Sequence, residues 1–166
     1  RPTTVALPYE GTDWERSTAA FVKKFFPEAG YKLVLDESYP PNQADFSAQL
    51  LKIKAAKPDY LVGCLYTPDH IIFSKQMMEQ KLDLPFGFMS VGAGSEDPVY
   101  YKAVPPQSVA YMFVQEDWDI LAPKRPWYPG LNEKTKAKLG YDANAYVAAG
   151  YGTIYVIKDA LERTKH

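Results

Sequence analysis

Short apolar runs alternate with longer amphipathic stretches along the first two thirds of the chain. Each run has the length and continuous hydrophobicity of a strand that is buried on both faces of a parallel sheet. Helices are predicted between the runs, where apolar residues recur at helical spacing. The predicted strands are 4–9, 31–35, 60–65, 86–91 and 109–114, and the predicted helices are 14–26, 45–57, 67–81 and 97–102.

This alternation of strand and helix is typical of α/β domains. Because the crossover between two parallel strands is right-handed, successive helices are expected to cover both faces of the sheet. We therefore predict a doubly wound, mostly parallel sheet with helices on both faces. The expected strand order is the flavodoxin-like order 2-1-3-4-5.

The first predicted helix has clear boundaries in the sequence. Thr12 or Asp13 is expected to cap its N-terminus, and Pro27 with Gly30 to end it. Its apolar face should pack on the sheet. That predicted face consists of Thr18, Phe21, Val22, Phe25 and Phe26.

The last third of the chain has a different pattern. A loop is predicted over residues 115–131, which are rich in proline, tryptophan and acidic side chains, and a short basic helix is predicted over 132–138. A long helix is predicted from Asp142 to Arg163, with apolar residues on nearly every side. Because a surface helix of a small domain carries one apolar stripe, this helix should pack on something outside the chain or dimerise with a second copy.

Length and charge exclude several classes of protein. A chain of 166 residues forms one domain, or two small ones. Its 19 Lys and Arg against 20 Asp and Glu give a net charge of −1, so no nucleic-acid partner is expected. No stretch is long and apolar enough to span a membrane. The chain opens at Arg1 directly before an apolar run, and we expect a processed or trimmed piece.

Candidate catalytic and metal-binding chemistry is sparse. The two histidines, His70 and His166, lie far apart, and His70 is expected on the surface at a helix start. The only cysteine, Cys64, lies in an apolar run and is expected to be a buried, inert thiol. No metal-ligand spacing, nucleophile elbow or phosphate-binding glycine loop occurs where its chemistry requires it. We therefore expect no metal, no cofactor and no enzymatic activity.

A ligand site is predicted at one edge of the sheet, because open α/β sheets bind ligands outside the carboxyl ends of their strands. That edge offers aromatic rings, hydroxyls and helix N-termini, which suit recognition of a small organic molecule. The alternative is that the aromatic rings only cap the sheet edge. The predicted site residues are Thr12, Asp13, Trp14, Tyr66, Thr67, Val91, Gly92 and Trp118.

The stretch DFSAQLLKIKAAKPD, residues 45–59, resembles a motif of the type I periplasmic solute-binding proteins of ABC importers, the branched-chain amino-acid binding protein family. The turn into the first helix, the Tyr-Pro-Pro at 39–41 and the segment 141–149 are similar to the family as well. The resemblance implies one α/β lobe, residues 1–114, of a two-lobed protein. It makes 115–131 a hinge or crossover, and 132–166 a helical tail that packs on a first lobe outside this sequence.

The resemblance also implies residue roles. Trp14 and Tyr66 stand where the family places aromatic residues against its ligand, whereas Val91 stands where amino-acid binders carry an acid for the ligand ammonium. This departure favours an aromatic or aliphatic carboxylate over an amino acid, unless Asp13, Glu116 or Asp117 supplies the charge. The implied partners are the solute and the membrane permease of an importer. The implied location is the periplasm or the cell exterior, with a lipid anchor as an option for the parent protein.

Two further interpretations remain open at the level of sequence. A ligand-sensing regulator or receptor domain would use the same lobe fold. A stand-alone flavodoxin-like enzyme or receiver would show a phosphate-binding or acidic pocket at the end of the first strand. The chain has Glu10-Gly11-Thr12-Asp13-Trp14 there and does not show that pattern.

Overall fold

The computed structural model describes residues 3–110, 112–115 and 130–164. The chain divides into two compact units, Arg1–Gln115 and Glu116–His166, which we describe one at a time. None of the helices described in either unit is long and apolar enough to cross a membrane.

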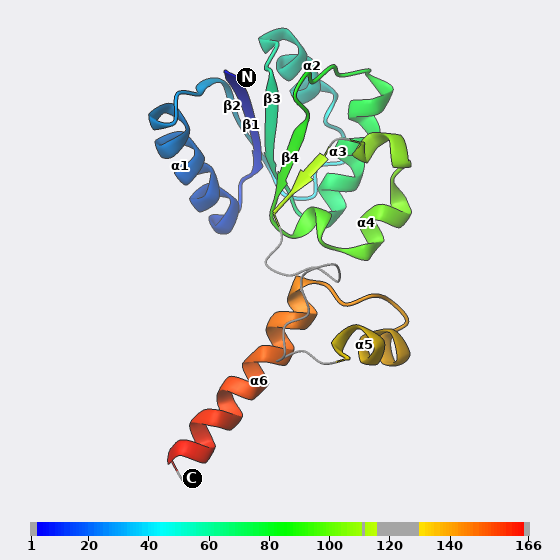
Figure 1. Ribbon diagram of the computed structural model, residues 1–166. Coiled ribbons are helices and arrows are strands. Elements are labelled where there is room, and N and C mark those ends of the chain that lie inside the picture. Colours follow the sequence, from blue (N-terminus) through cyan, green and yellow to red (C-terminus); the bar gives the residue numbers. More distant parts are fainter. Residues whose placement is uncertain (1–2, 111, 116–129, 165–166) are drawn as a thin grey trace. The chain divides into compact units, whose positions relative to one another are not determined.

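Within the described residues, the first unit is built on a parallel five-stranded sheet with the order β2-β1-β3-β4-β5 (Figure 1). This is the predicted flavodoxin-like order, so the predicted fold class is confirmed. The strands are β1 (Thr4–Glu10), β2 (Lys32–Tyr39), β3 (Tyr60–Cys64), β4 (Phe88–Val91) and β5 (Met112–Val114).

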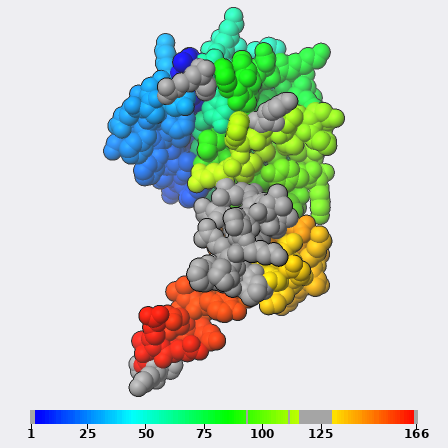
Figure 2. Space-filling view, viewed as in Figure 1, coloured from blue at the N-terminus to red at the C-terminus, as the bar shows by residue number. Residues whose placement is uncertain are grey.

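Helices cover both faces of this sheet (Figure 1). The helices of the unit are α1 (Asp13–Glu28), α2 (Ser47–Ala56), α3 (Thr67–Glu79) and α4 (Pro98–Ala103), with short 3₁₀ turns at Ala93–Ser95 and Pro106–Val109. The side chains of α1 and of the segment around α4 form opposite flanks of the unit (Figure 2).

Alternation along β1 separates two buried clusters, because successive side chains of a strand point to opposite faces. Val5 and Leu7 pack with Ala19 and Val22 of α1. Ala6 belongs to the cluster on the other face. That second cluster contains Phe46, Leu50 and Ile53 of the predicted second helix and Phe73 of α3.

Several boundaries differ from the sequence predictions. β2 continues beyond residue 35 to Tyr39, where Tyr39 is buried and packs edge-on against Phe46 with ring centroids 4.9 Å apart. The fifth strand begins at Met112 instead of residue 109, because Pro106–Val109 forms a 3₁₀ turn. α1 includes Pro27 and ends one residue later, since a proline in the last turn removes a single hydrogen bond.

The predicted apolar face of α1 is confirmed only in part, because Val22 is buried and Phe26 packs against the same cluster, but two of its phenylalanines are not buried. Phe21 and Phe25 are exposed, and their rings stack on each other with centroids 5.8 Å apart. The face that α1 buries consists of Glu15, Ala19 and Val22. The helix is therefore turned so that small residues approach the sheet and a carboxyl group enters the interior.

The second unit contains α5 (Leu131–Leu139) and α6 (Ala145–Thr164). Leu131 packs with Ala143 and Ala148, and so covers the beginning of α6. The later turns of α6 expose the apolar side chains Ile154, Tyr155, Val156, Ile157 and Leu161. The apolar surface predicted on this helix is present and uncovered along those turns.

Candidate functional site

Two aromatic rings meet at the carboxyl edge of the sheet. Trp14 lies in the first turn of α1, after β1, and Tyr66 directly precedes α3, after β3. Their ring centroids are 6.3 Å apart with a 46° angle between the ring planes. Trp14 is 48% exposed, so the pair offers an accessible aromatic surface beside the N-termini of two helices.

Gly92, after β4, lies directly against the Trp14 ring. Its φ of +99° is in the range that favours glycine. A Cβ atom at this position would stand 2.7 Å from Cζ3 of Trp14, closer than any side chain tolerates. The absence of a side chain at residue 92 is therefore what allows the indole ring to rest on the backbone.

Four of the other predicted site residues are described, and they lie at or next to the same edge of the sheet. Thr12 caps α1, its hydroxyl oxygen accepting the N–H of Glu15 at 3.5 Å. Asp13 is exposed in the first turn of α1, and Thr67 is half-buried in the first turn of α3. Val91 packs partly into the cluster between α1 and the sheet. Trp118 lies outside the described residues.

Three buried carboxyl groups lie beneath this edge, and the sequence analysis did not identify them. Glu10 ends β1, Glu15 is in the first turn of α1, and Asp69 is in the first turn of α3; they are 5%, 0% and 2% exposed. Glu10 and Asp69 hydrogen-bond each other. Burial and the charge of Asp69 together raise the pKa of Glu10 to about 7.

Glu15 is the least compensated of the three. Among the described residues, neither of its carboxyl oxygens has a nitrogen or oxygen hydrogen-bond partner. Burial raises the pKa of Glu15 to about 8, the charge of Glu10 adds to that shift, and a hydrogen bond from the Cys64 thiol opposes it. The position that a Cβ of Gly92 would occupy is 3.5 Å from Oε1 of Glu15. Glu15 thus lies against the same glycine as the Trp14 ring.

A signal for Glu15 existed in the sequence. Glu15, Ala19 and Val22 are spaced at i, i+4 and i+7, which is the spacing of one helix face. The predicted face included Phe21 and Phe25 because they are larger and more hydrophobic, although both are exposed. Small residues facing a sheet are an equally good sign of close packing.

His70 is buried, and the expectation of a surface histidine is wrong. Its ring stacks on Tyr100 with centroids 4.2 Å apart, and its Nδ1 lies 3.5 Å from the hydroxyl oxygen of Ser90. Burial lowers the pKa of His70 to about 3, so the ring is neutral and acts as a packing element. Across the described parts of the chain, no three His, Cys, Asp or Glu side chains cluster to hold a metal ion.

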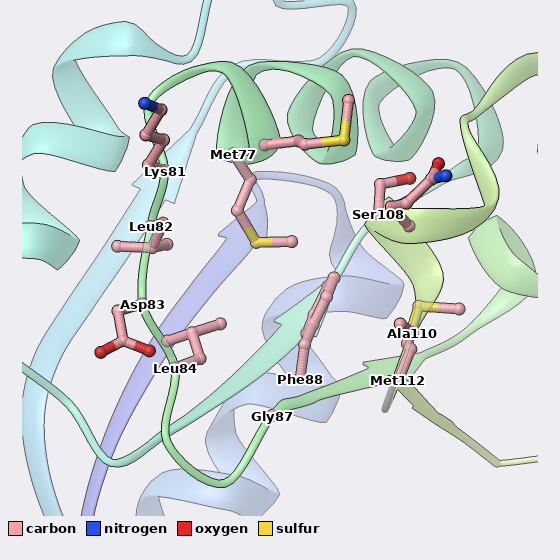
Figure 3. A pocket seen from close by; sticks show the side chains of 12 residues that line it. Met77, Lys81, Leu82, Asp83, Leu84, Gly87, Phe88, Ser108, Ala110 and Met112 are labelled. Atoms are coloured by element: carbon pink, nitrogen blue, oxygen red, sulfur yellow. The ribbon is translucent and has the colours of Figure 1, made fainter.

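A separate hollow of about 320 Å³ lies at the opposite, amino-terminal ends of β4 and β5 (Figure 3). Figure 3 shows Met77 and Phe88 between the loop carrying Leu82 and Leu84 and the segment carrying Met112. Leu82, Leu84 and Met112 also pack against the main buried cluster. Because ligands of open α/β sheets bind at the carboxyl ends of the strands, we take the Trp14–Tyr66 edge as the candidate site.

Comparison with known proteins gives a consistent result. A family model described as "Periplasmic binding protein" matches residues 1–166. The Leu/Ile/Val-binding protein homolog 7 of Brucella abortus (strain 2308) is 28% identical over 174 residues, which cover 97% of this chain and 41% of that protein. The chain therefore spans less than half the length of this curated relative.

Solved structures share the fold. The leucine binding protein LivK of Thermotoga maritima MSB8 superposes with a TM-score of 0.85 at 22% identity, over 98% of this chain and 45% of that one. A solute binding protein of an ABC transporter from Rhodopseudomonas palustris BisB5, in complex with 3,4-dihydroxybenzoic acid, has a TM-score of 0.77 at 20% identity, over 98% and 44% of the two chains.

Proposed function

The chain belongs to the periplasmic binding protein family, and from this premise we propose that it is one lobe of the solute-binding protein of an ABC importer. The solute is a small organic acid or an amino-acid-like molecule, held between this lobe and a second one. The role is binding without catalysis. The family implies a location in the periplasm or outside the cell.

One observation carries this proposal: Trp14, Tyr66 and Gly92 come together from three separate connections at the carboxyl edge of the sheet. Aromatic faces supply apolar contact for a small molecule, and the N-termini of α1 and α3 favour a carboxylate. The names of the relatives fit both solute types, since one concerns leucine and another a dihydroxybenzoic acid.

Length and the surface of α6 support the proposal of a first lobe outside this sequence. The chain covers 41% of its curated relative, and the later turns of α6 expose Ile154, Val156 and Leu161. We propose that a first lobe outside this sequence covers that face, with 115–131 as the hinge and 132–166 as part of the first lobe. The permease of the importer, and a lipid anchor if one is present, would engage the full-length protein.

Sedimentation of the short chain and of the full-length protein tests the proposed first lobe. The isolated chain of 166 residues should self-associate through the predicted segment from Asp142 to Arg163, which includes the exposed face of α6, whereas the full-length protein should stay monomeric. Ile154→Glu should abolish self-association of the short chain. A monomeric short chain without this substitution would count against an uncovered apolar face.

Removing the aromatic rings tests the site. In calorimetric titration of the full-length protein with amino acids and aromatic acids, Trp14→Ala and Tyr66→Ala should each weaken binding by about 30-fold or more, the typical effect of losing a central aromatic contact. Phe25→Ala is the matched control, because Phe25 is a similarly exposed aromatic residue near the far end of the same helix, 44% against 48% for Trp14. Equal affinities in all three variants would refute the assignment of the site.

A further inference from the structure

The three buried carboxyl groups beneath the carboxyl edge of the sheet, which we call the carboxyl cluster, have no positive charge to accompany them. Glu10 ends β1, Glu15 lies in the first turn of α1 and Asp69 in the first turn of α3, and each is at most 5% exposed. Among the described residues, no lysine, arginine or histidine forms an ion pair with any of them. Because an unpaired carboxylate is far more costly to bury than a neutral carboxyl group, the folded lobe favours the protonated forms.

The contacts within the carboxyl cluster also require protons. Glu10 and Asp69 hydrogen-bond each other, and two carboxyl groups can do so only when one of them carries a proton to donate. Neither oxygen of Glu15 has a nitrogen or oxygen partner among the described residues, so no such group compensates a charge on it. The closed edge therefore holds one proton between Glu10 and Asp69 and another on Glu15.

The same three residues connect the segments that build this edge of the sheet. Glu10 accepts the backbone N–H of Tyr66, and Asp69 accepts that of Asn42, in the loop after β2. Glu15 lies in the first turn of α1, which also carries an aromatic ring of the candidate site. Loss of the protons would place like charges side by side where these segments are held to β1, and like charges in a buried site repel each other strongly.

We propose that the carboxyl cluster is a pH-sensitive switch: its protons hold the first turns of α1 and α3 on the sheet, and their loss at alkaline pH opens this edge of the lobe. The inference does not depend on the proposed solute-binding function. Opening would separate the two aromatic rings of the edge, because Trp14 lies in one of these turns and Tyr66 directly precedes the other.

The titratable neighbours of the cluster do not compensate its charge. Tyr39 of β2 and Cys64 of β3 are buried acids, and burial raises the pKa of each, so both stay neutral. β4 contributes no titratable side chain. On α3, His70 is neutral as well, because burial lowers its pKa to about 3. The charged side chains next to these residues in the sequence are exposed: Asp13 and Arg16 beside Glu15, and Asp45 in the loop after β2.

The closed edge should lose stability as the pH rises from 6.5 to 8. Burial and a neighbouring carboxylate raise the pKa of Glu10 to about 7 and that of Glu15 to about 8, whereas in an open edge both return to about 4.5. The closed form therefore binds more protons across this range, and each proton lost favours opening. From these pKa values, Glu15 should raise the open fraction about 15-fold and Glu10 about fourfold, about 60-fold together. Below pH 6.5 an exposed His70 would bind a proton and oppose the effect, so the comparison begins there.

Hydrogen exchange of single backbone amides, measured by NMR on the full-length protein at pH 6.5 and pH 8, tests the switch. Three hydrogen-bonded amides report on the edge: Gly11, which donates to the last carbonyl of β2, Arg16 in α1 and His70 in α3. The hydrogen-bonded amides of Leu61, in β3, and Gln80, just after α3, are the controls, because they lie away from the cluster. After correction for the intrinsic rise of exchange with pH, protection of the edge amides should fall by about 60-fold and that of the controls by less than about threefold.

Two variants assign the protons to their residues. Glu15→Gln should reduce the fall in protection of the edge amides from about 60-fold to about fourfold, and Glu10→Gln combined with Glu15→Gln should reduce it to less than about threefold. Both should stay folded at pH 6.5, because a neutral amide replaces a carboxyl group that burial keeps protonated. Glu28→Gln, which changes an exposed carboxyl group at the far end of the same helix, is the matched control and should behave as the wild type.

Every outcome bears on the switch. A loss of protection that is confined to the edge amides and reduced by Glu15→Gln supports it. Equal losses at Leu61 and Gln80 would show that the whole lobe unfolds, and an undiminished loss in Glu15→Gln would show that another group titrates. Either result overturns the proposal, and so does a wild-type protein whose edge amides are equally protected at both pH values.

Discussion

Replacing Gly92 by alanine should destabilise the carboxyl edge of the sheet, and the structure separates two reasons. The first is the backbone: a φ of +99° costs a residue with a Cβ about 1–2 kcal/mol relative to glycine. The second is steric, because the new Cβ would stand 2.7 and 2.8 Å from two carbons of the Trp14 ring. Overpacking of this kind costs about 1–3 kcal/mol, so we expect a total loss of about 2–5 kcal/mol in the free energy of unfolding.

Two further sets of variants, measured by urea denaturation of the full-length protein, separate the backbone and steric parts of the loss in free energy of unfolding. Gly30→Ala reports the backbone contribution alone, because Gly30 has a φ of +85° and a Cβ there would meet nothing within 4 Å. Trp14→Ala combined with Gly92→Ala should recover the steric part, because the ring that clashes is gone. The reasoning is refuted if Gly92→Ala costs no more than Gly30→Ala, or costs the same with and without Trp14.

Two further predictions concern the rest of the lobe. Leu50→Ala should lower the free energy of unfolding, measured in urea, by about 2–5 kcal/mol, because Leu50 is 1% exposed. The neighbouring Leu51 is 61% exposed, so Leu51→Ala should change it by about 0.5 kcal/mol or less. Equal losses would show that α2 packs through a different face. Asp59→Asn should flatten the pH dependence of stability between pH 4 and pH 2. Hydrogen bonds from the N–H groups of Thr3 and Thr4 lower the pKa of Asp59 from 3.8 to about 2, so the carboxylate stabilises the fold above pH 3.8 and this stabilisation is lost as the pH falls toward 2. If the variant loses stability in acid in the same way as the wild type, this assignment is wrong.

The strand order of the sheet was predictable because short apolar runs, which form strands, alternate with amphipathic helical stretches and are joined to them by short connections. Right-handed crossovers leave few arrangements for such a chain. The ends of β2 and β5 were not predictable in this way. Tyr39 extends β2 because its ring packs on Phe46, seven residues later, and the beginning of β5 depends on a turn formed by Pro106–Val109.

The aromatic part of the candidate site followed from position alone, since Trp14 and Tyr66 come after neighbouring strands of the sheet. The buried carboxyls and His70 did not. Charged residues are seldom fully buried, so the pattern gave no reason to place the carboxyls inside, and His70 was expected on the surface. The burial of Glu15, Asp69 and His70 results from how α1 and α3 rotate on the sheet, and that rotation depends on the whole packing of the lobe. The roles of Thr12, Asp13, Thr67, Val91 and Trp118 in binding stay predictions.

Cys64 gives the lobe a built-in chemical reporter. It is the only cysteine of the 166 residues, it lies on the central strand β3, and its side chain is completely buried. Burial, with the neighbouring Glu15, also raises the pKa of the thiol, so that the reactive thiolate is suppressed as well as hidden. A thiol reagent can therefore modify this lobe only when β3 separates from its cover. The rate of modification, compared with that of an unfolded chain, measures how often the centre of the lobe opens, and a solute that closes the site should slow it.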